Sequence, residues 1–187
     1  EALAGEAEDP ASWLRQRGTR VRFLPPDVLM GTVRRFDRHN DQLLIADTLD
    51  GPSRAWQVAL HVAWTAMRAE IGALVRGHAF ASRTAETLVR RALAAYGAAA
   101  LVMPYARFAT AAEERGYDIE ALANLFGASF EQAAHRLPTL HRPGMERVPF
   151  FFIGVDAALA LWHRGLAITL VHRNTRVLSQ MTDEEGG

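Results

Sequence analysis

The segment SRTAETLVRRALAAYGAAALVMP, residues 82–104, carries the strongest helical signal in the chain. Ser82 is a favourable N-cap residue, and Glu86 lies in the first turns that would follow it. Pro104 ends the segment because proline cannot continue a helix without a break. Residues 92–102 are rich in alanine and leucine, so we expect this helix to be largely buried.

Helical patterns extend on both sides of this segment. After the Pro104 kink, YARFATAAEERG (105–116) predicts a second helix, and DIEALANLFG (118–127) with SFEQAAHRL (129–137) predicts a short helix pair. Before it, SRAWQVALHVAWTAMRAEIGALV (53–75) predicts one continuous helix. Its apolar side chains form one stripe, made of Trp56, Ala59, Leu60, Ala63, Ala66 and Met67.

Strand patterns lie on both sides of the helical region, and a short helix precedes the first of them. A first helix begins at Asp9-Pro10, and Gly18 ends it. TRVRFL (19–24) and TVRRFDRHNDQLLIAD (32–47) predict a strand and a hairpin, which together make a three-stranded antiparallel sheet. Three further strands are expected in the tail, at 148–156, 166–173 and 175–181. The predicted fold class is α+β, a small antiparallel sheet packed on a mainly helical core with a short β tail.

The amino-acid composition excludes several classes of function. The 187 residues suffice for one compact domain, and the 21 acidic side chains balance the 21 basic ones, so no global positive field attracts nucleic acid. Every basic residue is arginine, so an anion would be held by Arg or His. The absence of cysteine excludes disulfides, thiolate catalysis and cysteine-ligated metals within these residues. No apolar run reaches the length of a membrane span, so no membrane association is expected.

The motifs of common enzymes are missing. A zinc hydrolase would place an H-E-x-x-H motif on the helix at 53–75, where the sequence LHVAW (60–64) has His61 but neither the Glu nor the second His. There is no G-x-S-x-G elbow and no glycine-rich phosphate loop. We therefore expect no catalytic residues, no metal and no enzymatic activity, and we interpret His61 as a polar residue on a packed helix.

The helix pair at 118–137 could be a DNA-binding helix-turn-helix, with Gly127 at the turn and Ser129 as a cap. A recognition helix offers Arg, Lys, Asn or Gln to base edges and phosphates. The second helix of this pair has one Glu, one Gln and a single Arg. Contact with DNA through these residues is kept as an alternative.

The segment AHRLPTLHRP (134–143) raises the question of what its two His-Arg pairs face. Arg136, together with Tyr96, Tyr105 and Arg107 near the Pro104 kink, could line a narrow apolar slot with a cation at its mouth. Such a slot would suit a short acyl chain that carries a charged group. Alternatively, surface carboxylates neutralise Arg107 and Arg136. The candidates for that pairing are Glu113, Glu114, Asp118 and Glu131.

Residues 93–156 contain a series of spaced motifs: L-x-x-Y, M-P-Y-x-R-F, Y-D-I-E-x-L, F-G-x-S-x-E-x-x-x-H-R-L, L-x-R-P-G and V-P-F-F-F. This series, with GTVRRFDRHNDQLLIADTL and RAWQVALHVAW before it, closely resembles the sensor domain of bacterial short-chain fatty acyl regulators. These are helix-turn-helix transcription factors of the ImmA/IrrE superfamily. The resemblance covers about residues 18–156, and the motifs follow the family's order.

The resemblance implies an effector-sensing domain with a degenerate zincin-like fold, whose DNA-binding part lies outside this chain. It implies a cytoplasmic homodimer that contacts DNA through that part and responds to a short-chain acyl-CoA, with no cofactor. Carried over by position, Arg136 contacts the CoA phosphates, with His135 beside it and Arg142 in support. Tyr96, Tyr105 and Arg107 lie along the acyl or pantetheine path. The chain begins at Glu1 without Met, so we expect a fragment.

The tail departs from the family pattern. VDAALALWHRG (155–165) stands where the family has a cysteine-containing motif, which excludes the iron–sulfur cluster of some relatives. The domains expected are residues 1–17 as an N-terminal helix and linker, 18–156 as the sensing domain and 157–187 as a divergent tail. The predicted function is ligand sensing within a transcriptional regulator. A protein-interaction or dimerisation module without a small ligand remains the alternative.

Overall fold

The computed structural model describes residues 9–144 together with Val148 and Phe150. The chain divides into two compact units, Glu1–Arg136 and Leu137–Gly187. The described part of the second unit contains a 3-10 helix at Leu137–Thr139. The strands expected in the tail and the boundary expected at residue 156 lie outside the described residues or at their edge, so both stay predictions.

Helix α1, Pro10–Gln16, is the first described element of the first unit and lies where the sequence predicts it. The Asp9 carboxylate accepts a hydrogen bond of 3.2 Å from the Ser12 backbone N–H, which satisfies one of the free donors at the helix start. Gly18 follows the helix with a φ of 81°, a conformation that glycine adopts without strain. The chain then enters the sheet.

Three strands form this sheet, β1 (Arg20–Leu24), β2 (Arg34–Asp37) and β3 (Gln42–Ala46), in the order β1-β3-β2. The hairpin of β2 and β3 is antiparallel as predicted. The expectation for β1 is wrong, because β1 pairs in parallel with β3 and the sheet is mixed. Between β1 and β2 the chain turns at Pro25-Pro26 and again at Met30 and Gly31, whose φ angles are 53° and 76°. This connection is too long for a tight hairpin and carries the chain across the sheet.

Helix α2 (Gly51–Ala66) and helix α3 (Arg68–Arg76) replace the single helix predicted at 53–75. The two are bent by 66° at Met67. Neither Gly nor Pro marks this break in the sequence, so the pattern alone could not reveal it. Gly97 of the facing helix lies against the break, and a Cβ built on Gly97 would come within 2.6 Å of the Met67 Sδ atom.

Helix α4 (Arg83–Val102) starts at the predicted Ser82 cap and stops before Pro104. Helix α5 (Tyr105–Glu114) follows at a bend of 65°, so the kink predicted at the proline is confirmed. The burial predicted for 92–102 is only partly correct. Ala94, Gly97 and Ala98 are buried, whereas Tyr96 is 49% exposed.

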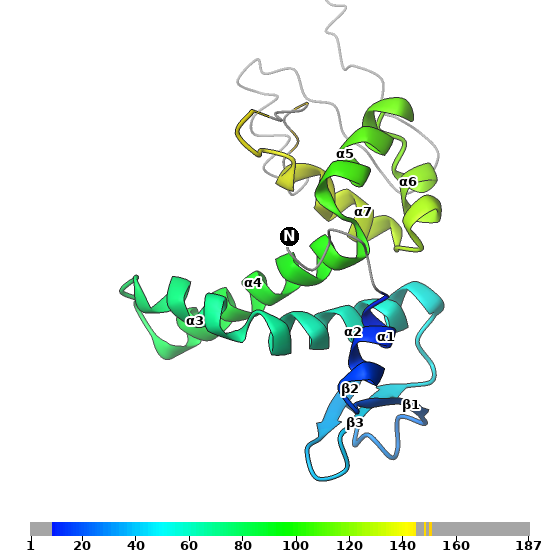
Figure 1. The fold of residues 1–187 in the computed structure, drawn as a ribbon, viewed down its shortest axis with the longest axis vertical. Helices are drawn as coiled ribbons and strands as arrows, with labels where there is room; N and C mark the ends of the chain where they lie inside the picture. The colour runs from blue at the N-terminus through cyan, green and yellow to red at the C-terminus, as the bar shows by residue number, and fades with distance from the viewer. Residues whose placement is uncertain (1–8, 145–147, 149, 151–187) are drawn as a thin grey trace, which may run out of the picture. The chain divides into compact units, whose positions relative to one another are not determined.

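The predicted helix pair is present as α6 (Ile119–Phe126) and α7 (Phe130–Arg136). Asp118 caps α6 by accepting a hydrogen bond from the Ala121 N–H, and Gly127 ends it with a φ of 60°. In Figure 1, α5, α6 and α7 gather at the end of α4 where the Pro104 bend lies.

Among the described residues, two hydrophobic clusters join α1, the sheet, α2 and α4. The first contains Trp13, Leu14, Leu43, Ile45, Val58 and Val62, so it ties α1 and the sheet to α2. The second contains Ala59, Ala63 and Ala98, where small side chains let α2 and α4 lie side by side (Figure 1). The α+β class is therefore confirmed, with a mixed rather than an antiparallel sheet.

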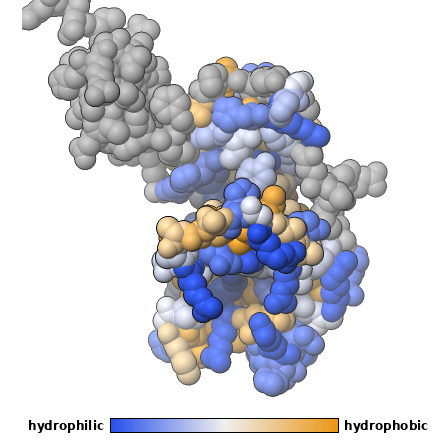
Figure 2. Space-filling model, turned by 90° about the vertical axis from the view of Figure 1, so that its left-hand side faces the viewer, coloured by the Kyte–Doolittle hydropathy of each residue, from blue (hydrophilic) through white to orange (hydrophobic). Residues whose placement is uncertain are grey.

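The hydrophobicity of the helices and of one face of the surface can be compared with that of membrane-spanning segments. Among the described residues, no single helix combines the length and hydrophobicity of a membrane span, although two bent pairs, α2 with α3 and α4 with α5, reach that threshold jointly. On the face shown in Figure 2, a hydrophobic band crosses the view and hydrophilic side chains border it.

Candidate functional site

Arg136, the last residue of α7, lies at the centre of the predicted ligand-binding residues. Its side chain is almost completely buried, with 1% of its surface exposed. The Nε–H donates a hydrogen bond of 3.1 Å to the backbone carbonyl of Met103. Met103 is the last residue before the Pro104 bend, where a helix leaves carbonyl groups without an intrahelical partner. Arg136 therefore connects α7 to the bend between α4 and α5.

Two predicted aromatic residues accompany Arg136. Its guanidinium carbon lies 5.5 Å from the ring centre of Tyr96 and 5.9 Å from that of Tyr105. Tyr105 is 6% exposed, whereas half of Tyr96 faces solvent. Three of the six predicted ligand-binding residues thus come together, and we call Tyr96, Met103, Tyr105 and Arg136 the Arg136 cluster.

The other three predicted ligand-binding residues are exposed, unlike the buried Arg136 and Tyr105. His135 is exposed, although it neighbours Arg136 in sequence. Arg107 is exposed and its guanidinium carbon lies 5.9 Å from the ring centre of Phe126. Arg142 is exposed and belongs to the second unit. The ligand contacts predicted for all six residues stay predictions.

The carboxylates proposed as alternative partners are partly engaged elsewhere. Asp118 caps α6, and a Glu114 carboxylate oxygen lies 3.9 Å from the guanidinium of Arg115. In α7, the Gln132 side-chain oxygen accepts a hydrogen bond of 2.9 Å from the Ser129 N–H. The helix pair therefore uses its glutamine as a cap, which leaves fewer polar groups for contact with DNA bases.

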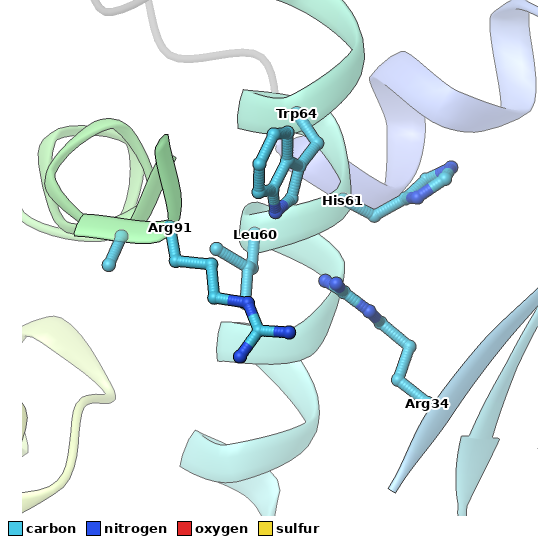
Figure 3. Close-up of a pocket in the computed structure, with 6 residues that line it drawn as sticks. Arg34, Leu60, His61, Trp64 and Arg91 are labelled. Carbon is cyan, nitrogen blue, oxygen red and sulfur yellow. The ribbon is translucent and has the colours of Figure 1, made fainter. Parts of the chain in front are cut away.

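A second feature is a pocket of about 640 Å³ between β2, α2 and α4, which we call the β2–α2–α4 pocket. Its lining side chains come from all three elements: Arg34, Leu60, His61, Trp64, Arg91 and Ala95. In Figure 3 the side chains of Arg34 and Arg91 extend from opposite sides toward the space in front of α2, and the indole ring of Trp64 lies beyond Leu60.

The charge of this pocket is unbalanced. Two arginines line it, and no carboxylate of the described residues does. Arg34 donates a hydrogen bond of 3.2 Å to the Gln57 carbonyl, and burial lowers the pKa of its guanidinium. Within the described residues, Arg91 makes no hydrogen bond or ion pair and is exposed.

His61 supplies a neutral polar group beside these charges. Burial, followed by the nearby positive charge of Arg34, lowers the pKa of His61 to about 4. Its ring packs against Phe36 with 4.6 Å between the ring centres. As predicted, His61 is a polar residue on a packed helix, and at neutral pH its imidazole carries no charge.

Sequence reasoning did not identify Arg34, Trp64 or Arg91 as candidate site residues. Their signal is faint, because each lies in a different element and nothing in the spacing shows that β2 and α4 meet across α2. Among the described residues, no group of three or more His, Asp or Glu side chains could hold a metal ion.

The fold and the pocket describe an α+β domain in which His61 and Trp64 of α2 share a pocket with arginines from β2 and α4. Residues 14–138 match the family model described as the IrrE N-terminal-like domain. The chain belongs to this family, as the sequence motifs predict.

Three similar proteins add detail. Over 124 residues the chain is 40% identical to the HTH-type transcriptional regulator RamB of Mycobacterium tuberculosis, which covers 66% of the chain and 26% of RamB. It is 40% identical over 121 residues to the propionyl-CoA carboxylase regulator of Cereibacter sphaeroides, covering 65% of the chain and 26% of that protein. A solved structure of a Mycobacterium tuberculosis transcriptional regulator superposes with a TM-score of 0.71 at 31% identity, covering 79% of this chain and 46% of the other.

These relatives are named as regulators, and the chain spans about a quarter of the length of the curated ones. The matched part of the chain contains the sheet and α2–α7, with both the β2–α2–α4 pocket and the Arg136 cluster. The chain is thus homologous to one portion of bacterial transcriptional regulators.

Proposed function

We propose that this domain is the effector-sensing part of a bacterial transcriptional regulator of short-chain fatty acid metabolism, and that its effector is a short-chain acyl-CoA. The observation that carries the proposal is the environment of His61 on α2. There the side chains form a pocket with two arginines and no described carboxylate, instead of a set of metal ligands. Such a pocket is suited to binding an anionic metabolite rather than to hydrolysing a peptide.

The acyl group is assigned to the Arg136 cluster. The bend at Pro104 separates α4 from α5, and Tyr96 and Tyr105 lie on either side of it. A short acyl chain between these rings would contact both helices. His135 and Arg107 remain the proposed polar residues around that end of the ligand, and the ligand contact predicted for Arg142, which belongs to the second unit, stays a prediction.

Regulation would follow from differential binding. An effector that prefers one arrangement of α4 and α5 shifts the population toward it, and a DNA-binding part attached to the domain senses the shift. We propose that this part lies outside the present chain and that the full protein acts as a cytoplasmic homodimer without a cofactor.

Isothermal titration with CoA, acetyl-, propionyl- and butyryl-CoA tests the proposal. We expect micromolar binding that ranks the acyl chains, and we expect Tyr96→Leu to reduce the preference among them. Tyr96 is suitable because its half-exposed side chain is not required by the core. Arg136→Ala is a second variant, compared at equal folded fraction. Absence of binding by every ester to folded protein overturns the proposal.

A protein-interaction module is the second candidate, and one observation favours it. Large apolar side chains are exposed on neighbouring helices, with Leu74 on α3 55% exposed and Leu88 on α4 57% exposed. Sedimentation of the wild-type chain beside a Leu74→Glu/Leu88→Glu variant, combined with the CoA-ester titration, distinguishes the candidates. An interaction module predicts self-association that the two substitutions abolish, together with no binding of CoA esters.

A further inference from the structure

We infer that the β2–α2–α4 pocket binds the nucleotide end of the effector, with Arg34 and Arg91 on its phosphate groups and Trp64 against its base. The inference rests on the proposed function, because it takes the effector to be a CoA ester. It assigns phosphate recognition to two arginines that the sequence motifs do not single out.

The first argument concerns charge. Two guanidinium groups share one pocket, and no carboxylate of the described residues lines it with them. Arg34 uses one N–H for the Gln57 carbonyl, which leaves further donors for a ligand. Burial adds a desolvation cost to the charged form of Arg34. A bound anion would offset this cost by its attraction to the guanidinium group.

The second argument concerns shape and composition. The volume of about 640 Å³ is that of a pocket for a metabolite rather than for a simple ion. Leu60, Ala95 and the Trp64 indole provide apolar surface in the same pocket as the two arginines. Phosphate groups on the arginines and a purine on the indole would match this arrangement, since bases stack on aromatic side chains.

The third argument compares the two arginine sites. The Arg136 side chain is 1% exposed and already donates a hydrogen bond to the Met103 carbonyl, so little of its surface is accessible to a phosphate group. Arg91 is exposed at the pocket and Arg34 is half-buried there. Arg34 and Arg91 are therefore the more accessible phosphate ligands.

Binding of propionyl-CoA and of adenosine 3′,5′-bisphosphate, measured by isothermal titration, tests the inference. We expect both ligands to bind, and Arg91→Gln to weaken both by about 10- to 100-fold, as loss of a hydrogen bond to a charged group does. Arg91→Gln should fold normally because the side chain is exposed. Arg34→Gln and Trp64→Leu are supporting variants, and Trp64→Leu should weaken adenosine 3′,5′-bisphosphate more than inorganic phosphate.

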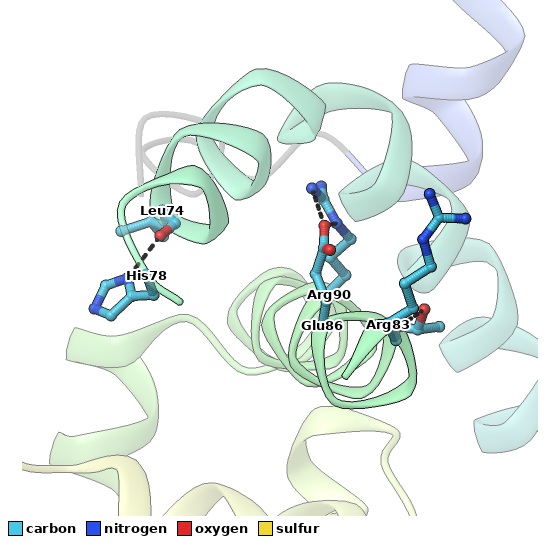
Figure 4. A network of polar contacts seen from close by, with 6 residues as sticks. Leu74, His78, Arg83, Glu86 and Arg90 are labelled. Atoms are coloured by element: carbon cyan, nitrogen blue, oxygen red, sulfur yellow. Dashed lines mark hydrogen bonds and ion pairs between the residues drawn. The ribbon is translucent and has the colours of Figure 1, made fainter. Parts of the chain in front are cut away.

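Arg90→Gln is the matched control. Arg90 is the neighbouring residue on α4 and pairs with Glu86 at 2.8 Å instead of lining the pocket (Figure 4). Its substitution removes the same charge from the same helix and should leave both affinities within about twofold, because this charge lies outside the pocket and is screened by solvent and by Glu86.

The outcomes separate the inference from the proposed function. If propionyl-CoA binds with equal affinity to the wild type, Arg34→Gln and Arg91→Gln, the inference is wrong and the proposed function stands. If adenosine 3′,5′-bisphosphate binds through Arg91 but no CoA ester binds, the pocket is a nucleotide site and the proposed function is wrong. If neither ligand binds, both are overturned.

Discussion

At the scale of single residues, a buried arginine is the most informative side chain. Arg136 is among the largest fully buried side chains in the described structure. Burial of a charge is costly unless hydrogen bonds compensate it, and Arg136 donates to the carbonyl at the α4–α5 bend while two tyrosine rings lie beside it. We infer that this residue stabilises the bend whether or not it also contacts a ligand.

This stabilisation can be measured by substituting methionine for Arg136. Arg136→Met removes the donor to the Met103 carbonyl and leaves that acceptor buried, so we expect a loss of about 1–3 kcal/mol in the free energy of unfolding. Urea unfolding at pH 7 measures it. The exposed Arg107→Met serves as control and should change stability little. Equal stability of the two variants would show that the Met103 carbonyl does not depend on Arg136.

His61 makes stability depend on pH. Its pKa is about 4 in the folded chain, against a usual value near 6.5 in the unfolded chain. Between these values the unfolded state binds more protons, so this contribution to stability is present above about pH 6.5 and is lost as the pH falls toward 4. Burial and the positive charge of Arg34 on β2 lower this pKa; Phe36 of β2 packs against the His61 ring, and Arg91 of α4 lines the same pocket.

We therefore expect the stability difference between wild type and His61→Gln to shrink or reverse on acidification. Urea midpoints at pH 7, 6, 5 and 4.5 measure the difference, and subtraction of the two proteins removes the titration of Asp37, Asp50 and other carboxylates. A constant difference across this range would mean that the folded chain does not depress the pKa of His61.

Among single residues, those that act through local chemistry were predictable. Asp9, Ser82 and Asp118 cap helices as their residue types suggest, and Pro104 breaks the helix as its missing N–H requires. Exposure of Tyr96 was not predictable. An alanine-rich helix shows little contrast between its faces, so the sequence does not tell which face α2 covers.

At the scale of elements, the packing of α2 against α4 depends on a glycine. A Cβ at Gly97 would lie 2.6 Å from the Met67 Sδ and 3.1 Å from the Ala63 Cβ. Gly97→Ala should lower the free energy of unfolding by about 1–2 kcal/mol through overpacking, despite the higher helix propensity of alanine. Urea unfolding measures this change, and Met67→Ala in the same chain should recover part of it.

The double variant makes the prediction specific. If Gly97→Ala is as stable as the wild type, the helices can separate without cost and the close approach of α2 to α4 is unimportant. If Met67→Ala adds its own loss without any recovery, the two positions do not interact.

Two features of the elements escaped prediction because they are tertiary. β1 pairs with β3 rather than with its neighbour in sequence, and alternation of side chains is the same in parallel and antiparallel edge strands. The break at Met67 has no Gly or Pro to mark it and coincides with the contact at Gly97. In both cases the sequence predicted the strand or the helix. Contact with another element determined the strand pairing and the position of the helix break.

At the scale of the whole molecule, a neutral chain contains a locally cationic pocket. The 21 basic and 21 acidic residues cancel in the sequence, yet the fold brings Arg34 and Arg91 together from β2 and α4 without a described carboxylate. Composition correctly argued against a global basic field. It could not predict this local imbalance, which depends on the meeting of elements almost sixty residues apart in sequence.

The most direct test of the central claim is a two-dimensional ¹H–¹⁵N NMR titration of the whole chain with propionyl-CoA. Each of the four tryptophans carries one indole N–H, and Trp64→Phe and Trp13→Phe identify the signals of the pocket-lining and the buried tryptophan. A short-chain acyl-CoA sensor predicts a saturable shift of the Trp64 signal with micromolar affinity, while the buried Trp13 signal stays in place. No shift of any indole or backbone amide signal at millimolar propionyl-CoA would contradict the claim.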